Sequence, residues 1–66
     1  MFSPDQIQFI RSIGLNLDFS NLTDDDYMEI ETKVGDVYTS EVEDYPDDVT
    51  PKILMCESIL DHIDEL

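Results

Sequence analysis

The sequence predicts an all-α protein, a small three-helix bundle formed by a single domain over residues 1–66. Three times in the sequence, a Ser or Thr directly follows an apolar residue and is itself followed by another apolar residue four positions later. This is the pattern of a helix start. Apolar residues then recur at helical spacing after each start. The short chain suits one domain with a small core.

The three predicted helix starts share the same chemistry. Ser3, Thr23 and Thr50 are the predicted N-caps, whose hydroxyls accept a hydrogen bond from a backbone N–H of the first turn. Pro4 and Pro51 follow two of these caps at the first helical position, where the missing N–H of proline costs no hydrogen bond. The flanking apolar residues predict a hydrophobic staple at each start: Phe2 with Ile7, Leu22 with Tyr27, and Val49 with Leu54.

The first helix is predicted over residues 4–13. It ends at Gly14, because glycine readily adopts the left-handed conformation that terminates a helix, and Leu15 then packs back on Ile10. Apolar and polar residues alternate over 15–20. This alternation predicts an extended, half-buried connector that covers the core.

The second helix is predicted over residues 24–40, with apolar residues at helical spacing on its buried face. Gly35 is its weak point, because a glycine costs about 1 kcal/mol inside a helix. The β-prone residues 37–39 follow this glycine, so a short strand stays open as an alternative to the end of the helix.

Residues 41–48, EVEDYPDD, are predicted to be an acidic loop, in which Pro46 excludes Tyr45 from the helical region. The third helix is predicted over residues 51–63, and its acidic end meets the negative pole of the helix dipole. The predicted core consists of Ile7, Ile10, Ile13, Leu17, Phe19, Leu22, Tyr27, Ile30, Val34, Leu54, Ile59, Leu60 and Ile63.

The charge is strongly unbalanced, with 17 acidic and three basic side chains and a net charge of −14. Direct nucleic-acid binding is excluded, because neutralising phosphates requires Lys and Arg. The lone Cys56 cannot close an internal disulfide, which predicts a reducing compartment, the cytoplasm. We expect no targeting segment and no membrane contact, because no run approaches the ~20 apolar residues of a span.

Neither a catalytic centre nor a cofactor is predicted, because the sequence has no phosphate-binding glycine loop, serine elbow or HExxH motif. Cys56 and His62 fall on different faces of the third helix, where we expect a core thiol and a solvated imidazole. The acidic clusters lack the alternating acids and the glycine of an EF-hand loop. No metal site is therefore predicted.

The functional prediction is non-catalytic protein binding through the acidic surface, with a basic surface of a host protein as the partner. Two alternatives stay open. One is a nucleic-acid mimic that inhibits a DNA- or RNA-binding protein. The other is a homo-oligomeric module, such as a homodimer, in which the wide apolar face of the third helix, with Met28, Met55 and Leu66, docks on itself or on a partner helix. Charge that only keeps the protein soluble is the plainest interpretation. The predicted binding residues are Asp24, Asp25, Asp26, Glu29, Glu41, Glu43, Asp44, Asp47 and Asp48.

The runs SPDQIQFIRSIGLNLDF, NLTDDDYMEIETKVGD and MCESILD resemble the small acidic uncharacterised proteins of bacteriophages and integrative elements of Gram-positive bacteria. The resemblance covers most of the chain and brings no catalytic or binding motif, so no residue role is transferred from it. It implies a cytoplasmic protein of a mobile element, a context in which small acidic modules that bind host proteins are common.

Overall fold

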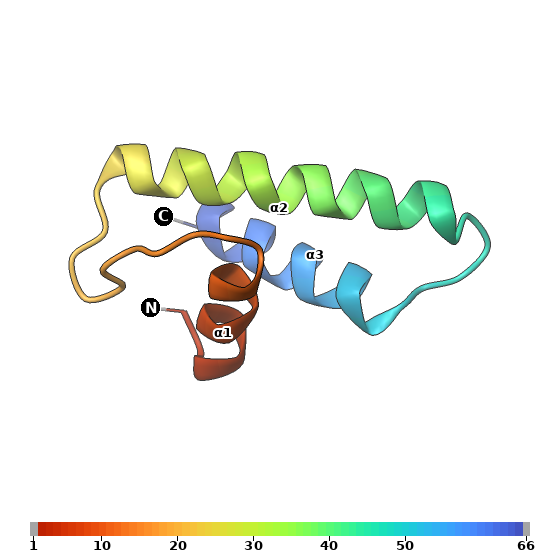
Figure 1. Ribbon diagram of the computed structural model, residues 1–66, viewed down its shortest axis with the longest axis horizontal. Helices are drawn as coiled ribbons and strands as arrows, with labels where there is room; N and C mark the ends of the chain where they lie inside the picture. Colours follow the sequence, from red (N-terminus) through yellow and green to blue (C-terminus); the bar gives the residue numbers. More distant parts are fainter. Residues whose placement is uncertain (1, 66) are drawn as a thin grey trace.

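A computed structural model describes residues 2–65 and confirms the predicted all-α fold (Figure 1). Helix α1 spans Pro4–Ser12, α2 spans Asp24–Asp44 and α3 spans Pro51–Asp64. Helices α2 and α3 form an antiparallel hairpin, and the shorter α1 lies across it and packs on α3. The molecule is elongated, 37 × 19 × 19 Å, because α2 runs along its length. None of the helices within residues 2–65 has both the length and the apolar composition needed to cross a bilayer.

The three helix starts are confirmed. Each predicted cap hydroxyl accepts a 3.2 Å hydrogen bond from the backbone N–H three residues later: Gln6 N–H to Ser3, Asp26 N–H to Thr23 and Ile53 N–H to Thr50. At the first two starts, the side chain three residues after the cap also accepts a hydrogen bond from the backbone N–H of the cap residue. Gln6 accepts from the Ser3 N–H at 2.8 Å, and Asp26 accepts from the Thr23 N–H at 3.0 Å. Each of these capping boxes satisfies two N–H groups that the helix itself leaves unpaired.

Helix α1 ends in the predicted glycine turn. Gly14 has φ +102°, and its N–H donates to the Arg11 carbonyl at 3.1 Å. The Leu15 N–H donates to the Ile10 carbonyl at 3.4 Å, which completes a Schellman motif.

The half-buried pattern of the connector is confirmed as well, since its apolar residues are buried or half-buried and alternate with exposed polar residues. The predicted extended conformation is wrong for residues 19–20, which form a turn in which the Asn21 N–H donates to the Asp18 carbonyl at 3.0 Å.

Helix α2 continues four residues beyond its predicted end, so the predicted loop over 41–48 is wrong for its first half. Gly35 does not interrupt the helix, because packing along α3 outweighs the ~1 kcal/mol cost of one glycine. The Thr39 hydroxyl also donates to the Gly35 carbonyl at 3.0 Å. The helix ends only at Tyr45, whose φ of −131° and ψ of 65° are non-helical because Pro46 follows.

The core lies where the three helices meet. The most deeply buried apolar side chains are Phe2, Ile10, Leu15, Ile30, Val34, Ile53, Cys56 and Ile59. Every predicted core residue is buried or packs against this cluster, with one exception. Leu54 is 55% exposed, because it points away from the side of α3 that carries Cys56 and Ile59. Its neighbour Ile53, which is 4% exposed, takes that place in the core.

The prediction of a solvated His62 is wrong. The imidazole packs against the Phe2 ring with 4.5 Å between ring centroids, and its Nε2 atom is buried without a hydrogen-bond partner among residues 2–65. Phe2 also contacts Phe19 and Tyr27, at centroid distances of 6.3 and 6.2 Å. The residue that precedes the cap of α1 thus folds back over the end of α3 and covers the imidazole.

Candidate protein-binding surface

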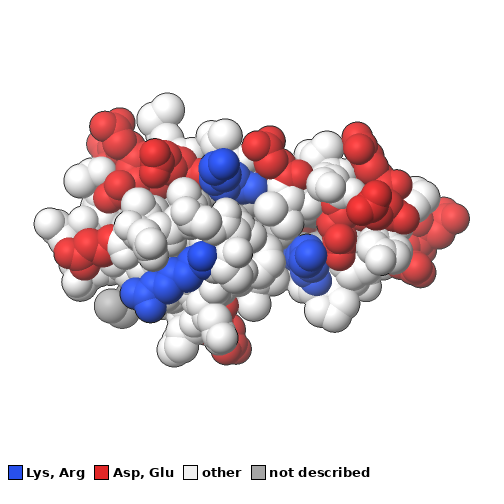
Figure 2. Space-filling view, viewed as in Figure 1, with Lys and Arg blue, Asp and Glu red and all other residues white. Residues whose placement is uncertain are grey.

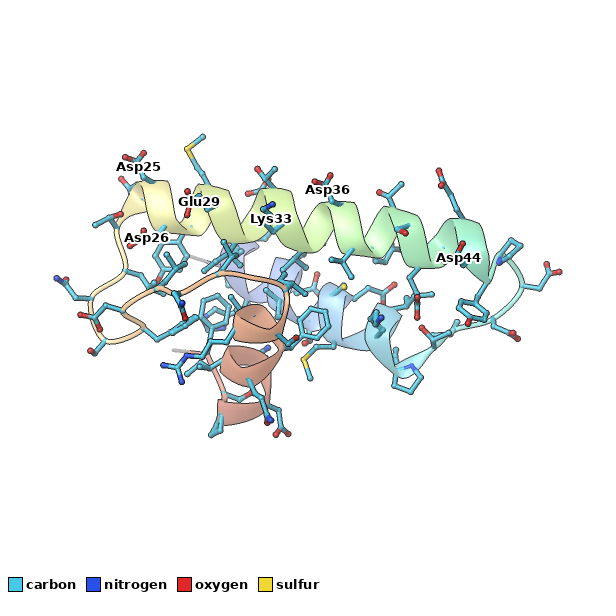
Figure 3. All side chains as sticks on the ribbon, in the orientation of Figure 1. Asp25, Asp26, Glu29, Lys33, Asp36 and Asp44 are labelled. Carbon is cyan, nitrogen blue, oxygen red and sulfur yellow. The ribbon has the colours of Figure 1, made fainter. Side chains whose placement is uncertain are left out.

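The nine carboxylates predicted to bind a partner lie in two groups at opposite ends of α2 (Figure 3). The first group consists of Asp24, Asp25, Asp26 and Glu29, and the second of Glu41, Glu43, Asp44, Asp47 and Asp48. At 1.5 Å per helical residue, Asp25 and Asp44 are about 28 Å apart. This separation exceeds the ~10 Å screening length at 0.1 M salt. The structure therefore presents two acidic surfaces and does not bring the nine residues into one site.

Two of the nine carboxylates have structural roles. Asp26 closes the capping box at the start of α2. Glu41 is half-buried and accepts a 2.8 Å hydrogen bond from the Thr50 hydroxyl, which links the last turn of α2 to the cap of α3. The remaining seven are exposed: Asp24, Asp25, Glu29, Glu43, Asp44, Asp47 and Asp48.

Four exposed carboxylates form a ridge along α2. Asp25, Glu29, Asp36 and Glu43 are spaced by four, seven and seven residues, which keeps them within about 40° around the helix axis. Figure 3 shows Asp25 and Asp36 on the side of α2 that faces away from α1 and α3. Sequence reasoning missed Asp36, although its seven-residue spacing from Glu29 and Glu43 identifies it.

The few basic side chains interrupt this acidic surface along its middle. Figure 2 shows Lys and Arg along the centre of one face, with Asp and Glu toward its two ends. Lys33 projects from the middle of α2 (Figure 3). The Arg11 guanidinium lies 5.5 Å from the centroid of the Phe19 ring, in a cation–π arrangement. The acidic side chains seen on this face therefore gather mostly toward the two ends of the molecule.

Two of the predicted binding residues, Glu41 and Asp44, line the same surface depression. It measures about 360 Å³, lies between the second half of α2 and the first turn of α3, and is lined by Asp36, Val37, Ser40, Glu41, Asp44 and Lys52. Within residues 2–65, no group of three or more His, Cys, Asp or Glu side chains is placed to hold a metal ion. The depression offers carboxylates to a cationic side chain, with Lys52 opposing its negative charge.

Cys56 is a packing residue, as predicted. The side chain is fully buried, and this burial raises the pKa of its thiol above the ordinary value of 9.0. The carboxylates of Glu41 and Glu57 raise the pKa further, and Lys52 opposes them. The thiol is therefore protonated and enclosed at neutral pH, which disfavours nucleophilic chemistry.

Several large apolar side chains are exposed, and among them sequence reasoning had predicted only Met28 for an apolar docking face. They are Met28, Val42, Tyr45, Val49 and Leu54, with exposed fractions of 66, 37, 48, 70 and 55%. Of the residues predicted for an apolar docking face, Met28 is exposed, Met55 is half-buried, and Leu66 lies outside the described residues. Val42 had a signal in the sequence, because it lies at helical spacing from Tyr38 and Tyr45, on a different side of α2 from Ile30 and Val34.

Known proteins provide no functional residue for this surface. No protein-family model matches the chain, and no curated protein or solved structure matches it either. A function is therefore inferred from the exposed residues of the chain itself.

Proposed function

We propose that this protein is a non-catalytic interaction module that binds a basic surface of another protein in the cytoplasm. The observation that carries the proposal is the exposure of seven of the nine predicted carboxylates. A net charge of −14 disfavours the compact state through self-repulsion. Among the nine predicted carboxylates, and within residues 2–65, only Asp26 and Glu41 offset this cost with a capping box or a hydrogen bond between helices. Binding of a basic partner offsets the cost of self-repulsion for the seven exposed carboxylates.

The helical scaffold supports this role physically. Most of the seven carboxylates lie on α2, whose backbone is fixed by its own hydrogen bonds and by packing on α3. Binding therefore orders side chains and leaves the main chain of the helix unchanged, which limits the entropy lost. Complementary charge also steers a basic partner toward the surface and increases its association rate.

Affinity capture at two salt concentrations tests the proposal. The purified protein is immobilised and exposed to a Gram-positive bacterial lysate at low and at high salt, and bound proteins are identified by mass spectrometry. The matched control carries amides in place of the seven exposed carboxylates, Asp→Asn and Glu→Gln. These substitutions keep the shape of the side chains and remove their seven negative charges. We expect the native chain to capture basic proteins much more strongly at low than at high salt, and the amide variant to capture them weakly at either salt concentration. Equal capture by both chains, or capture that salt does not weaken, contradicts the proposal.

The charge density favours a nucleic-acid mimic as the second candidate. A net charge of −14 over a length of 37 Å is one charge per about 2.6 Å, against one per ~1.7 Å along duplex DNA. The ridge of carboxylates on α2 gives part of this charge a linear arrangement. A partner of this kind binds both ligands in one groove, so duplex DNA added to the capture column is expected to elute it. Retention of the partner in the presence of DNA favours an ordinary basic surface.

A further inference from the structure

Exposed apolar side chains collect at one end of the molecule. Four of the five named above lie in or near the turn between α2 and α3: Val42, Tyr45, Val49 and Leu54. The fifth, Met28, lies near the opposite end of α2. Single exposed apolar residues are ordinary on a protein surface, whereas a group on one side of a small domain marks a contact surface.

The register of the hairpin places Val42 and Leu54 on the same side. The Tyr38 hydroxyl donates to Glu57 Oε1 at 3.4 Å, so these two residues face each other across α2 and α3. Val42 is one turn beyond Tyr38 in α2, and Leu54 is about one turn before Glu57 in α3. Because the helices are antiparallel, Val42 and Leu54 both lie closer to the connecting turn than the Tyr38–Glu57 hydrogen bond does, on the same side of the hairpin as that bond.

Two further residues extend this apolar surface toward the turn. Tyr45 is three residues after Val42, at the spacing that makes side chains neighbours on a helix. Val49 and Leu54 hold the two staple positions around the cap of α3, but they are 70 and 55% exposed. Helix α1 leaves this end uncovered, since its Gln6 meets α3 one turn further along, at Ser58 (3.2 Å).

Acidic side chains border the apolar group. Asp47 and Asp48 lie in the connecting turn, and Glu57 and Asp61 follow Leu54 along the same side of α3 at spacings of three and seven residues. An apolar centre with a charged rim is the usual organisation of a specific protein interface. A second copy of this chain would bring an identical acidic rim against this one, and like charges facing each other oppose such a contact.

We propose that this side of the hairpin, with Val42, Tyr45, Val49 and Leu54 at its centre, is the docking surface for a partner segment that carries apolar side chains flanked by Lys or Arg. The proposal rests on the proposed function and specifies where the basic partner binds. The apolar centre supplies binding free energy that salt does not screen, and the acidic rim selects a cationic partner.

Peptide titration followed by NMR tests this docking surface. The probe is a short amphipathic helical peptide of Leu and Lys, and the comparator has Ser in place of every Leu at the same charge. We expect the Leu peptide to shift the amide signals of residues 42–54 most and to bind more tightly than the Ser peptide. The double substitution Val42→Ser and Leu54→Ser weakens binding of the Leu peptide about tenfold, because two exposed apolar contacts are lost.

Met28→Ser is the matched control, because it removes a more exposed apolar side chain at the far end of α2. This variant is expected to bind the Leu peptide like the native chain. All three replaced residues are exposed, so we expect both variants to fold like the native chain. Thermal unfolding of each variant checks this.

Three results overturn the inference. Equal binding of both peptides, unchanged by the double substitution, means that charge alone attracts the partner, and the proposed function then survives without this docking surface. If neither the Leu peptide nor the Ser peptide binds, both proposals are contradicted. Self-association of the native chain that the double substitution abolishes identifies a second copy as the occupant.

Discussion

At the scale of single residues, one helical position separates a core residue from a surface residue at the start of α3. Ile53 is 4% exposed and Leu54 is 55% exposed, although both are apolar and adjacent in the sequence. Both fall within the wide apolar face of this helix, so periodicity alone did not show which of them α2 covers. The burial of His62 could not be predicted for a similar reason, because it depends on the Phe2 ring, which is distant in the sequence.

Substitution of these two residues by alanine measures the difference. Ile53→Ala is expected to lower the free energy of unfolding by about 2–4 kcal/mol, because it leaves a cavity in the core. Leu54→Ala is expected to change it by less than about 0.5 kcal/mol. Urea denaturation of both variants checks this. Equal losses of stability contradict the assigned orientation of α3.

Cys56 makes stability depend on pH in the alkaline range. Burial raises the pKa of its thiol above 9.0, so the folded chain holds this proton at pH values where the unfolded chain releases it. The contribution of the thiol is fully present below the unfolded pKa and is lost as the pH rises through the folded pKa. We expect the native chain to lose more stability than Cys56→Ala above about pH 9, which thermal melts of both chains measure. Parallel pH profiles contradict the pKa shift.

At the scale of elements, caps and turns were predictable because their chemistry is local. The hydroxyl of each cap and the N–H that it binds lie three residues apart, and the glycine turn after α1 is equally local. The end of α2 was not predictable to the same degree. The glycine penalty at Gly35 is visible in the sequence, whereas the opposing contribution of packing on α3 depends on residues far along the chain.

The two glycines respond in opposite ways to alanine. Gly35 is helical with open space around the position of a Cβ atom, so Gly35→Ala is expected to stabilise the protein by about 1 kcal/mol. Gly14 has φ +102°, and Gly14→Ala is expected to destabilise the protein by about 1–2 kcal/mol. Chemical denaturation compares the two. A loss of stability in Gly35→Ala indicates that α2 is broken at this residue.

At the scale of the whole molecule, the net charge of −14 is spread over an elongated shape, and the acidic side chains on the face seen in Figure 2 gather mostly toward its two ends. The sequence predicted binding carboxylates at the start of the second helix and in the loop after it, but not that the helix continues for four further residues into the second group. Nor did it show that the apolar residues near the second group share one side of the hairpin, because that follows from the register of α2 on α3. The fold was therefore more predictable than the surface.

Self-repulsion on this scale makes the stability of the protein depend on salt. We expect the melting temperature at neutral pH to rise as NaCl is increased from about 0.01 to 0.3 M, because screening weakens repulsion between the acidic side chains. The variant with amides at the seven exposed carboxylates is expected to melt higher at low salt and to respond less. A melting temperature that does not change with salt contradicts the view that this charge opposes folding.

Capture of a partner at low and at high salt, by the native chain and by the seven-amide variant, tests most directly that the exposed carboxylates bind a basic protein. We expect basic proteins to bind the native chain at low salt, to bind it much less at high salt, and to bind the variant weakly at either salt concentration. Capture that is the same for both chains, or that high salt does not weaken, would contradict this claim.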